Sequence, residues 1–305
     1  MNFRRRTLVV TGASGHLGRR AVELLLDAEA GRIVAATRSP EKLVTLADRG
    51  AEIRRADFDD PVSLIEAFAG ADRLLLISTD ALGRRLPQHR AAIRAALRAG
   101  AKHVVYTSLP NPEKWESDFA TEHAETEMAL RASGLGWTVL RNNLYTDDLL
   151  PKLSSAIASG QLVAAAGDRG AAYVTREDCA GAAAAALASS DFDGRTFDVT
   201  GPAAVTHAEL AKIASDVSRS RVEYLRTPSG NSFEVAIAKG YLETVTGSVE
   251  ELTGYPPTSV AEFLTEHADI LIEAAEPPPF ASNRRSSRRF AVSRTNGTRD
   301  NARAG

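Results

Sequence analysis

The chain has 305 residues, of which 44% are hydrophobic and 25% charged, with a formal net charge of −2. These proportions exclude a wholly disordered, collagen-like or coiled-coil protein, and the length suits one domain with a smaller appendage. Cys179 is the only cysteine, so an intrachain disulfide and a four-cysteine zinc site are both excluded. We expect a cytoplasmic protein, because a single cysteine fits a reducing compartment, and we identify no metal ligands.

The net charge is close to zero, but the C-terminal end of the chain is rich in arginine. Residues 277–305 carry seven arginines against one aspartate, a net of +6, so the other residues sum to about −8. We therefore expect no nucleic-acid-binding face on the body of the protein. No apolar run approaches the roughly 18 residues of a membrane span, and the N-terminus lacks the roughly 7–15 apolar residues of a signal peptide. Residues 276–305, rich in Pro, Ser, Arg and Asn, are predicted to form a disordered basic tail.

Strand and helix signals alternate through residues 1–150. Most of the strands are short apolar runs, and several of the helices between them begin at a proline or end at a glycine. Strands are predicted at 7–11, 33–37, 52–55, 73–78, 103–108 and 137–141, and helices at 19–29, after 38–40, at 60–70, 87–99 and 118–133. This alternation predicts a doubly wound parallel α/β sheet, Rossmann-like, with right-handed crossovers. We take residues 1–150 as the first domain, with its sheet completed by later segments.

The second half is less regular. Residues 175–178 predict a capping box that opens an alanine-rich helix ending near residue 188. Further strands are predicted at 196–200 and 221–225, and helices at 207–218 and within 257–272. We interpret residues 151–275 as a smaller α/β region on the substrate side, followed by the tail at 276–305.

A glycine-rich turn between the first strand and the first helix is the strongest functional signal. Its pattern, G-x-x-G-x-x-G, lets the backbone turn tightly and approach a pyrophosphate, while the amides at the helix start supply hydrogen bonds and partial positive charge. A purely structural glycine turn is the alternative. The residues predicted to bind a dinucleotide here are Gly12, Ser14, Gly15, His16, Leu17 and Gly18.

Arg38 indicates which dinucleotide is used. NAD enzymes usually place Asp or Glu about 20 residues after the glycine motif, where the carboxylate bonds the ribose 2′-hydroxyl. This chain has Arg38 there, 20 residues after Gly18, and Lys42 follows one turn later. A guanidinium can bind a 2′-phosphate through two hydrogen bonds, which favours NADPH. The alternative is a solvated surface arginine.

Further cofactor contacts are expected where the later strands end, because ligands of open parallel sheets lie at the carboxyl ends of strands. Asp57 and Phe58 follow the third strand and are placed to meet the adenine ring, although a turn aspartate beside a half-buried Phe is nearly as good an interpretation. The candidates after the fourth and fifth strands are Ile77, Ser78, Thr79, Thr107 and Ser108. These residue types also form simple turns.

The proton relay of ordinary short-chain dehydrogenases is absent. That relay pairs a tyrosine acid with a lysine four residues later, and none of the six tyrosines of this chain has lysine at that spacing. Phe119 and His123 occupy the two corresponding positions. His123 and Glu127 share a helix face, so the carboxylate could orient the imidazole. The alternative is an exposed histidine among glutamates.

Without a strong acid, the chemistry is restricted. Reduction of a ketone creates an alkoxide, which needs a proton donor or an oxyanion hole. Reduction of a quinone creates a far more stable phenolate-like anion, which water can protonate, and hydride addition to a cationic dye carbon creates no oxyanion at all. The expected partner is therefore a small, intrinsically electrophilic electron acceptor stacked against the nicotinamide.

The chain resembles the NmrA-like atypical short-chain dehydrogenases, and within them the bacterial NAD(P)H:quinone oxidoreductase type 2 and triphenylmethane reductase group. The resemblance spans about residues 7–265. It rests on TGASGHLG (11–18), Arg38-Ser-Pro, RLLLIS (73–78), PQHR (87–90), YTSL (106–109), the Glu122-His123…Glu127 helix, LRNNLY (140–145) and VTREDCAGAA (174–183). It implies an NADPH-dependent enzyme in which residues 142–147 line the nicotinamide and the acceptor cleft. By this resemblance Asn142 becomes a cofactor-binding candidate, and Asn143 and Tyr145 join His123 as catalytic candidates.

Two features depart from the family. Residues 227–257, which help to cover the acceptor in such relatives, look short here, and the arginine-rich tail has no counterpart.

The leading hypothesis is an NADPH-dependent reductase of quinones or dye-like aromatics. The alternatives are an NADP(H)-sensing regulator of the NmrA type, without turnover, and a sugar-nucleotide epimerase or lyase, which would need a tyrosine acid. The sequence leaves a homodimer open.

Overall fold

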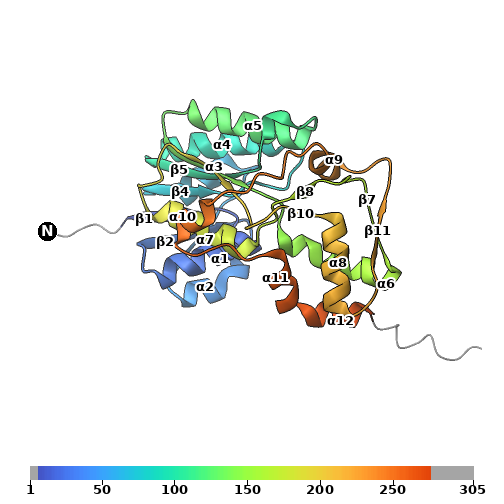
Figure 1. Cartoon of the computed structure of the whole chain (residues 1–305). Helices are drawn as coiled ribbons and strands as arrows, with labels where there is room; N and C mark the ends of the chain where they lie inside the picture. The colour runs from blue at the N-terminus through green and yellow to red at the C-terminus, as the bar shows by residue number, and fades with distance from the viewer. Residues whose placement is uncertain (1–5, 276–305) are drawn as a thin grey trace, which may run out of the picture.

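The computed structural model describes residues 6–275, and the predicted tail lies outside them. A seven-stranded parallel sheet forms the centre of the large lobe (Figure 1). In spatial order its strands are β3 (Glu52–Arg55), β2 (Arg32–Thr37), β1 (Thr7–Val10), β4 (Arg73–Leu76), β5 (His103–Ser108), β6 (Gly136–Asn142) and β9 (Thr196–Val199). The inner strands are apolar runs buried on both faces, as expected when helices cover both sides of a parallel sheet. The predicted doubly wound α/β fold is confirmed.

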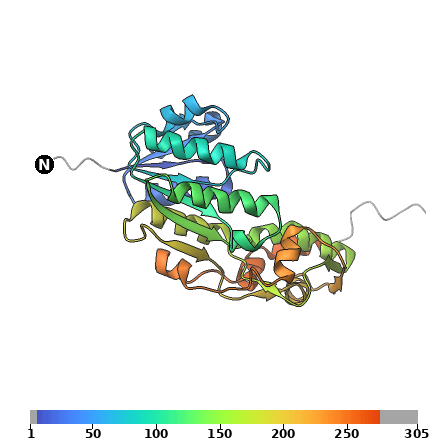
Figure 2. The same ribbon diagram turned by 90° about the horizontal axis from the view of Figure 1, so that it is seen from above.

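Helices cover both faces of this sheet (Figure 2). One core lies between the sheet and α1 (His16–Asp27), α7 (Arg176–Ala188) and α10 (Ser248–Thr253). A second core lies under α3 (Pro61–Phe68), α4 (Arg85–Arg98) and α5 (Asp118–Arg131). The short α2 (Val44–Asp48) packs beside the first core. The buried helix α7 is mostly alanine, and these small side chains let it lie close to α1 and the strands.

The small lobe has its own hydrophobic core. It contains two short strand pairs, β7 (Gln161–Ala164) with β11 (Glu223–Arg226) and β8 (Gly170–Ala171) with β10 (Val205–Thr206). Its helices are α6 (Leu149–Ser159), α8 (His207–Ser218), α9 (Ser232–Ala238), α11 (Val260–Glu266) and α12 (Ala268–Ala275). The smaller α/β part is therefore present, while the proposed boundary at residue 150 stays a prediction.

Three local expectations need correction. Helix α1 begins at His16, inside the glycine motif, and not at Arg19. The single helix expected within 257–272 is two helices, α11 and α12, separated at His267. The capping box at residues 175–178 is only half formed: the Thr175 hydroxyl accepts the Asp178 N–H, whereas the Asp178 carboxylate accepts the N–H of Thr258. Asp178 therefore ties the start of α7 to the segment before α11.

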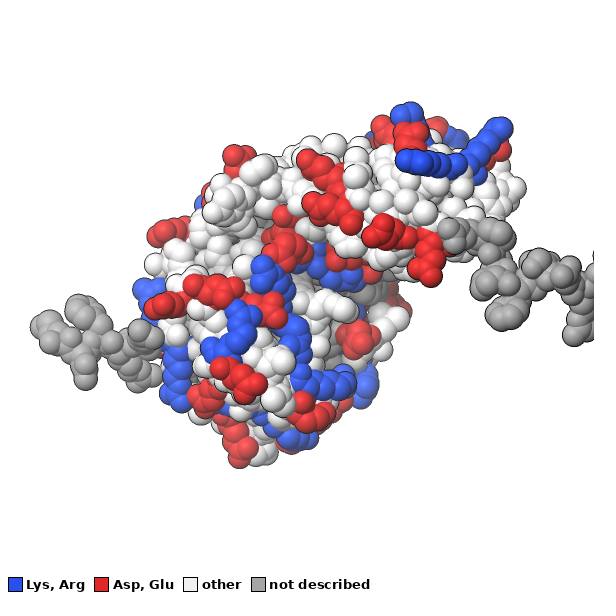
Figure 3. Space-filling model, turned by 90° about the horizontal axis from the view of Figure 1, so that it is seen from below, with Lys and Arg blue, Asp and Glu red and all other residues white. Residues whose placement is uncertain are grey.

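Within residues 6–275, no helix is both long enough and apolar enough to cross a membrane. The face drawn in Figure 3 carries acidic and basic side chains side by side and shows no continuous basic stripe.

Candidate functional site

The glycine loop holds α1 close to the end of β1. Gly12 has a φ of +62°, in the left-handed region that favours glycine. A Cβ on Gly18 would collide with the Gly12 carbonyl group, so only glycine lets the first turn of α1 approach the loop this closely. Gly15 is the N-cap, and no side chain caps the helix start. The first-turn amides are therefore available to an anion.

The predicted loop residues differ in what they expose. Ser14, Gly15 and His16 are exposed, whereas the Leu17 side chain is buried in the core under the sheet. Leu17 can therefore meet a ligand only through its backbone. The Thr37 hydroxyl donates to the Ser14 hydroxyl at 2.9 Å, which fixes the loop against the end of β2.

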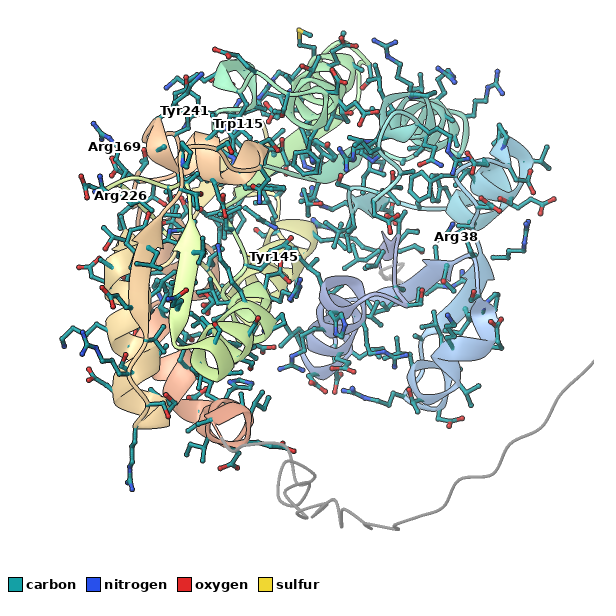
Figure 4. All side chains as sticks on the ribbon, turned by 90° about the vertical axis from the view of Figure 1, so that its right-hand side faces the viewer. Arg38, Trp115, Tyr145, Arg169, Arg226 and Tyr241 are labelled. Atoms are coloured by element: carbon teal, nitrogen blue, oxygen red, sulfur yellow. The ribbon has the colours of Figure 1, made fainter. Side chains whose placement is uncertain are left out.

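Arg38 directly follows β2 and is exposed. Among the residues that the structure describes, its guanidinium has no hydrogen-bond or ion-pair partner, unlike Arg19, which donates to the Lys42 carbonyl oxygen at 2.7 Å. Figure 4 shows Tyr145 near the middle of the molecule, with Arg38 to its right and Trp115 above it. Arg38 is thus a free cation at the end of the strand beside the glycine loop.

Asp57 and Phe58 have structural partners of their own. The Asp57 carboxylate accepts the N–H of Asp59 at 3.0 Å and lies 3.5 Å from the Arg55 guanidinium. Phe58 packs edge-on against His89, with ring centroids 6.3 Å apart. The turn interpretation of these two residues therefore has direct support in the geometry.

Hydrogen bonds to threonine and histidine side chains tie the ends of β1, β4 and β5 together. Thr107 accepts the N–H of Ser78 at 2.9 Å, and Thr11 accepts that of Ile77 at 3.0 Å. Thr79 donates its N–H to His89 Nε2 at 3.1 Å. These bonds hold the segment from Ile77 to Thr79 in one conformation at the carboxyl edge of the sheet.

His89 was not identified as a site residue from the sequence, although PQHR was among the motifs of the family resemblance. Its side chain is fully buried, and burial, aided by Arg85, lowers its pKa to about 3. Because Nε2 accepts the N–H of Thr79, the proton lies on Nδ1 and faces the Thr126 hydroxyl at 3.1 Å. His89 is therefore a neutral, structural histidine.

A cleft of about 510 Å³ opens at this edge, between the sheet and the small lobe. Five aromatic side chains line it: Trp115, Phe119, Tyr145, Tyr173 and Phe233. It also gathers nine of the predicted site residues: Ile77, Ser78, Thr79, Thr107, Ser108, His123, Asn142, Asn143 and Tyr145. A cleft that combines aromatic side chains with polar groups suits a flat organic ligand with polar substituents.

A larger hollow, of about 790 Å³, lies at the opposite edge of the sheet, where the strands begin. Arg73, His103 and Asp193 line it, and the Asp193 carboxylate lies 2.7 Å from the Arg73 guanidinium and 3.3 Å from His103 Nδ1. Ligands of open parallel sheets bind at the carboxyl ends. The aromatic cleft is therefore the candidate site.

His123 is not the exposed histidine of the alternative interpretation: it is only 4% exposed. Its Nδ1 lies 2.8 Å from the hydroxyl of the fully buried Tyr106. Burial, followed by the charge of Arg85, lowers the pKa of His123 to about 2, and burial raises the pKa of Tyr106. The two side chains therefore form a neutral pair, and neither is a strong acid at neutral pH.

The predicted partnership of His123 with Glu127 is wrong. Glu127 accepts from the Ser108 hydroxyl at 2.7 Å and from the guanidinium groups of Arg131 and Arg141 at 3.0 and 2.9 Å. A nearly buried carboxylate is stable only when paired and hydrogen-bonded, and these three donors meet that need. Tyr106 was missed as the partner of His123 because it lies on β5, and only the crossing of α5 over the sheet brings them together.

The turn after β6 holds the remaining candidates. Asn143 uses its amide locally, donating from Nδ2 to the Leu242 carbonyl oxygen at 3.0 Å and accepting the N–H of Leu144. Tyr145 lies under the Arg176 guanidinium, 4.7 Å from the ring centroid, and its hydroxyl is 3.4 Å from Asn142 Nδ2. Asn142 Oδ1 is buried and has no hydrogen-bond partner among residues 6–275. A buried acceptor left in this state indicates a missing donor.

Comparison with known proteins agrees with this geometry. A family model described as NAD(P)H-binding matches residues 12–190. The chain is 35% identical to quinone oxidoreductase 2 of Escherichia coli over 84% of its own length and 96% of the relative's.

Solved structures of the same group align over nearly their whole length. The NADPH complex of the E. coli quinone oxidoreductase aligns with a TM-score of 0.81 and 34% identity, covering 85% of this chain and 99% of the other. Citrobacter sp. triphenylmethane reductase with NADP(H) aligns with a TM-score of 0.78 and 32% identity, covering 86% and 99%. The chain therefore belongs to the NAD(P)H-binding, NmrA-like family and is an NAD(P)H-dependent oxidoreductase.

Proposed function

We propose that this protein uses NADPH to reduce quinones, or similarly electrophilic aromatic compounds such as triphenylmethane dyes. The observation that carries the proposal is the neutral His123, which lines a cleft with several aromatic side chains and contacts the buried Tyr106 hydroxyl behind it. Such a site can hold and stack a flat acceptor, but it offers no strong acid to protonate an alkoxide. The names of the related enzymes, which include quinone and dye reductases, support the same substrate class.

The residues present fit the dinucleotide. The uncapped start of α1, with Gly12, Gly15 and Gly18, suits the pyrophosphate, and the exposed, unpaired Arg38 suits a 2′-phosphate. The orphaned Asn142 Oδ1 suits a carboxamide N–H donor such as that of nicotinamide. The other expected contacts are Ser14, His16, Leu17, Asp57, Phe58, Ile77, Ser78, Thr79, Thr107 and Ser108.

The reaction needs only one hydride and one proton. Bound NADPH supplies the hydride, which adds two electrons to the quinone and leaves a hydroquinone anion. Water then protonates this stable anion. His123 donates or accepts a hydrogen bond as a neutral imidazole, Tyr145 offers a ring for stacking, and Asn143 fixes the turn that carries Asn142. Their contribution is orientation and exclusion of water rather than proton supply.

The test compares acceptors with the purified full-length chain. We expect NADPH oxidation, followed at the nicotinamide absorbance band, with benzoquinone and not with a simple aliphatic ketone. His123→Ala should slow turnover by less than about tenfold, because general acid catalysis is typically worth 10²-fold or more. A loss of several orders of magnitude would make His123 a proton donor. Cofactor binding without oxidation of any acceptor would favour the NADP(H)-sensing regulator instead.

We further propose a cytoplasmic location, supported by a single cysteine, Cys179, which is buried. The homodimer that the sequence leaves open stays a prediction.

A further inference from the structure

Three polar side chains from three helices of the small lobe meet at the wall of the aromatic cleft. Lys152 comes from α6, His207 is the first residue of α8, and Glu234 comes from α9. Lys152 Nζ lies 3.0 Å from His207 Nε2 and 3.5 Å from Glu234 Oε1. Lys152 and Glu234 line the cleft itself. None of these residues has a part in the hydride transfer described above.

His207 supports Lys152 as a neutral acceptor. It is fully buried, and burial, together with the neighbouring Lys152, lowers its pKa to about 4. The neutral imidazole therefore accepts a hydrogen bond from the Lys152 ammonium through Nε2. Its ring packs at 5.7 Å from the ring of Tyr224, which keeps it in place. One of the three ammonium N–H groups is thus committed to a fixed, uncharged partner.

Glu234 is held by the backbone. Its Oε2 accepts the N–H of Ala165 at 3.2 Å, and its carboxylate occupies the space that a side chain on Gly230 would need. The Glu234 side chain is 14% exposed, against 35% for Lys152. The carboxylate therefore lies deeper in the wall, and the ammonium is the more accessible of the two charges.

The other cation of the cleft is less accessible. Arg85 is 3% exposed and already bonds the Thr79 carbonyl oxygen at 2.6 Å and the Glu122 carboxylate at 3.3 Å. Asp148, one helical turn before Lys152, pairs with Arg176 at 2.6 Å. Among the described residues that line the cleft, Lys152 is therefore the most accessible cation, and its long side chain is already ordered by two partners. Such preorganisation reduces the entropy that binding costs.

We infer that Lys152 forms an anion subsite for a carboxylate or sulfonate group carried by the aromatic acceptor. This inference rests on the proposed reductase function and deepens it: the aromatic side chains hold the ring, and the ammonium selects the substituent. The ion–ion contact lies in a partly enclosed cleft, where a charge-assisted hydrogen bond is worth more than one fully exposed to water. His207 and Glu234 act as positioning residues for Lys152.

The experiment compares naphthoquinone with its sulfonated derivative, for the wild type and three variants. Lys152→Met removes the charge at similar size, and Lys152→Arg keeps it. Lys212→Met is the matched control, because Lys212 is an exposed α8 residue that pairs with Asp216, away from the cleft. The ratio of kcat/KM for the sulfonated to the neutral quinone should fall about tenfold in Lys152→Met through a higher KM, the size expected for one charge-assisted hydrogen bond.

Lys152→Arg should keep at least half of this selectivity, and Lys212→Met all of it. An unchanged ratio in Lys152→Met, or the same fall in Lys212→Met, would overturn the inference. If the wild type reduces neither quinone, the proposed function fails, and calorimetry with naphthalene sulfonate then tests the subsite separately. Binding to the NADP⁺-saturated wild type, weakened about tenfold by Lys152→Met, supports the subsite, and equal binding to both contradicts it.

Discussion

Replacing Arg38 by alanine should change the preference between the two nicotinamide cofactors. Arg38 is exposed at the end of β2, and the substitution removes no side-chain hydrogen bond or ion pair to a described residue. NADPH and NADH differ only in the 2′-phosphate. We therefore expect Arg38→Ala to weaken NADPH binding while leaving NADH binding nearly unchanged.

The magnitude follows from the exposure of the site. Hydrogen bonds to charged groups contribute about 1.5–3 kcal/mol, and solvent screening at an exposed arginine favours the lower half of that range. A loss of about 2 kcal/mol corresponds to a roughly 30-fold rise in Kd for NADPH. Raising the salt concentration from about 0.1 M to about 1 M shortens the Debye length from about 10 Å to about 3 Å, so the effect should shrink with salt.

Calorimetric titration of both cofactors into the wild type and the variant measures this directly. Arg49→Ala is the matched control, because Arg49 is another exposed arginine of the same lobe, paired with Asp27 at 2.6 Å. An equal change in Kd for NADPH and NADH, or no change for either, would refute the assignment of Arg38 to the 2′-phosphate. A comparable shift in Arg49→Ala would show that general surface charge sets the preference.

Two further predictions concern stability. Gly18→Ala places a Cβ against the Gly12 carbonyl group, so it should lower the free energy of unfolding by about 1–3 kcal/mol in urea titrations; Gly15→Ala, with 3.3 Å to the same oxygen, should cost clearly less, and equal costs would contradict the packing argument. Acid should also destabilise the fold, because four buried histidines have pKa values lowered by burial below the unfolded value of about 6.5. They are His89, His103, His123 and His207, with pKa values of about 3, 4, 2 and 4. Unfolding then takes up protons below about pH 6.5, so each histidine should remove about 1.4 kcal/mol of stability per pH unit until its folded pKa is reached. NMR titration should find these imidazoles neutral at pH 5, and their protonation in the folded chain near pH 6 would contradict the reasoning.

Much of the fold was predictable because its strands are apolar runs that end at glycines or at polar turns. Five of the six strands of residues 1–150 follow this pattern, β3 (EIRR) being the exception, and the glycine loop was predicted from its position after β1. Pairing between distant segments was not predictable in the same way. Strand β9 was recognised as a strand, but its place beside β6 depends on tertiary packing and not on its own sequence.

The small lobe was harder for physical reasons. Strands β8 and β10 have two residues each, too few for any periodicity to appear. Helix α6 contains Pro151, which usually argues against a helix, yet Pro151 stands in the first turn, where its missing N–H would have had no helical partner. The local sequence therefore did not indicate helix α6, which packing in the small lobe stabilises.

In the candidate site, contacts between residues far apart in the sequence determine the partners of His123 and Glu127, which local spacing did not predict. The i, i+4 rule paired His123 with Glu127, but stronger donors from β5 and β6 bond the Glu127 carboxylate. The same crossing of α5 over the sheet gives His123 a different partner, Tyr106, and buries both. A sequence can show which residues share a helix face, whereas competition for a buried carboxylate depends on the whole fold.

The burial of His123 also has a chemical consequence. A histidine with a pKa of about 2 cannot hold a proton for transfer at neutral pH. Tyr106 behind it holds its proton too firmly to release, because burial raises its pKa. The pair thus offers a fixed polar surface at this position of the cleft, and it does not supply a proton as a tyrosine–lysine relay would. This chemistry supports the proposed acceptors, because quinones stabilise their own developing charge and simple ketones do not.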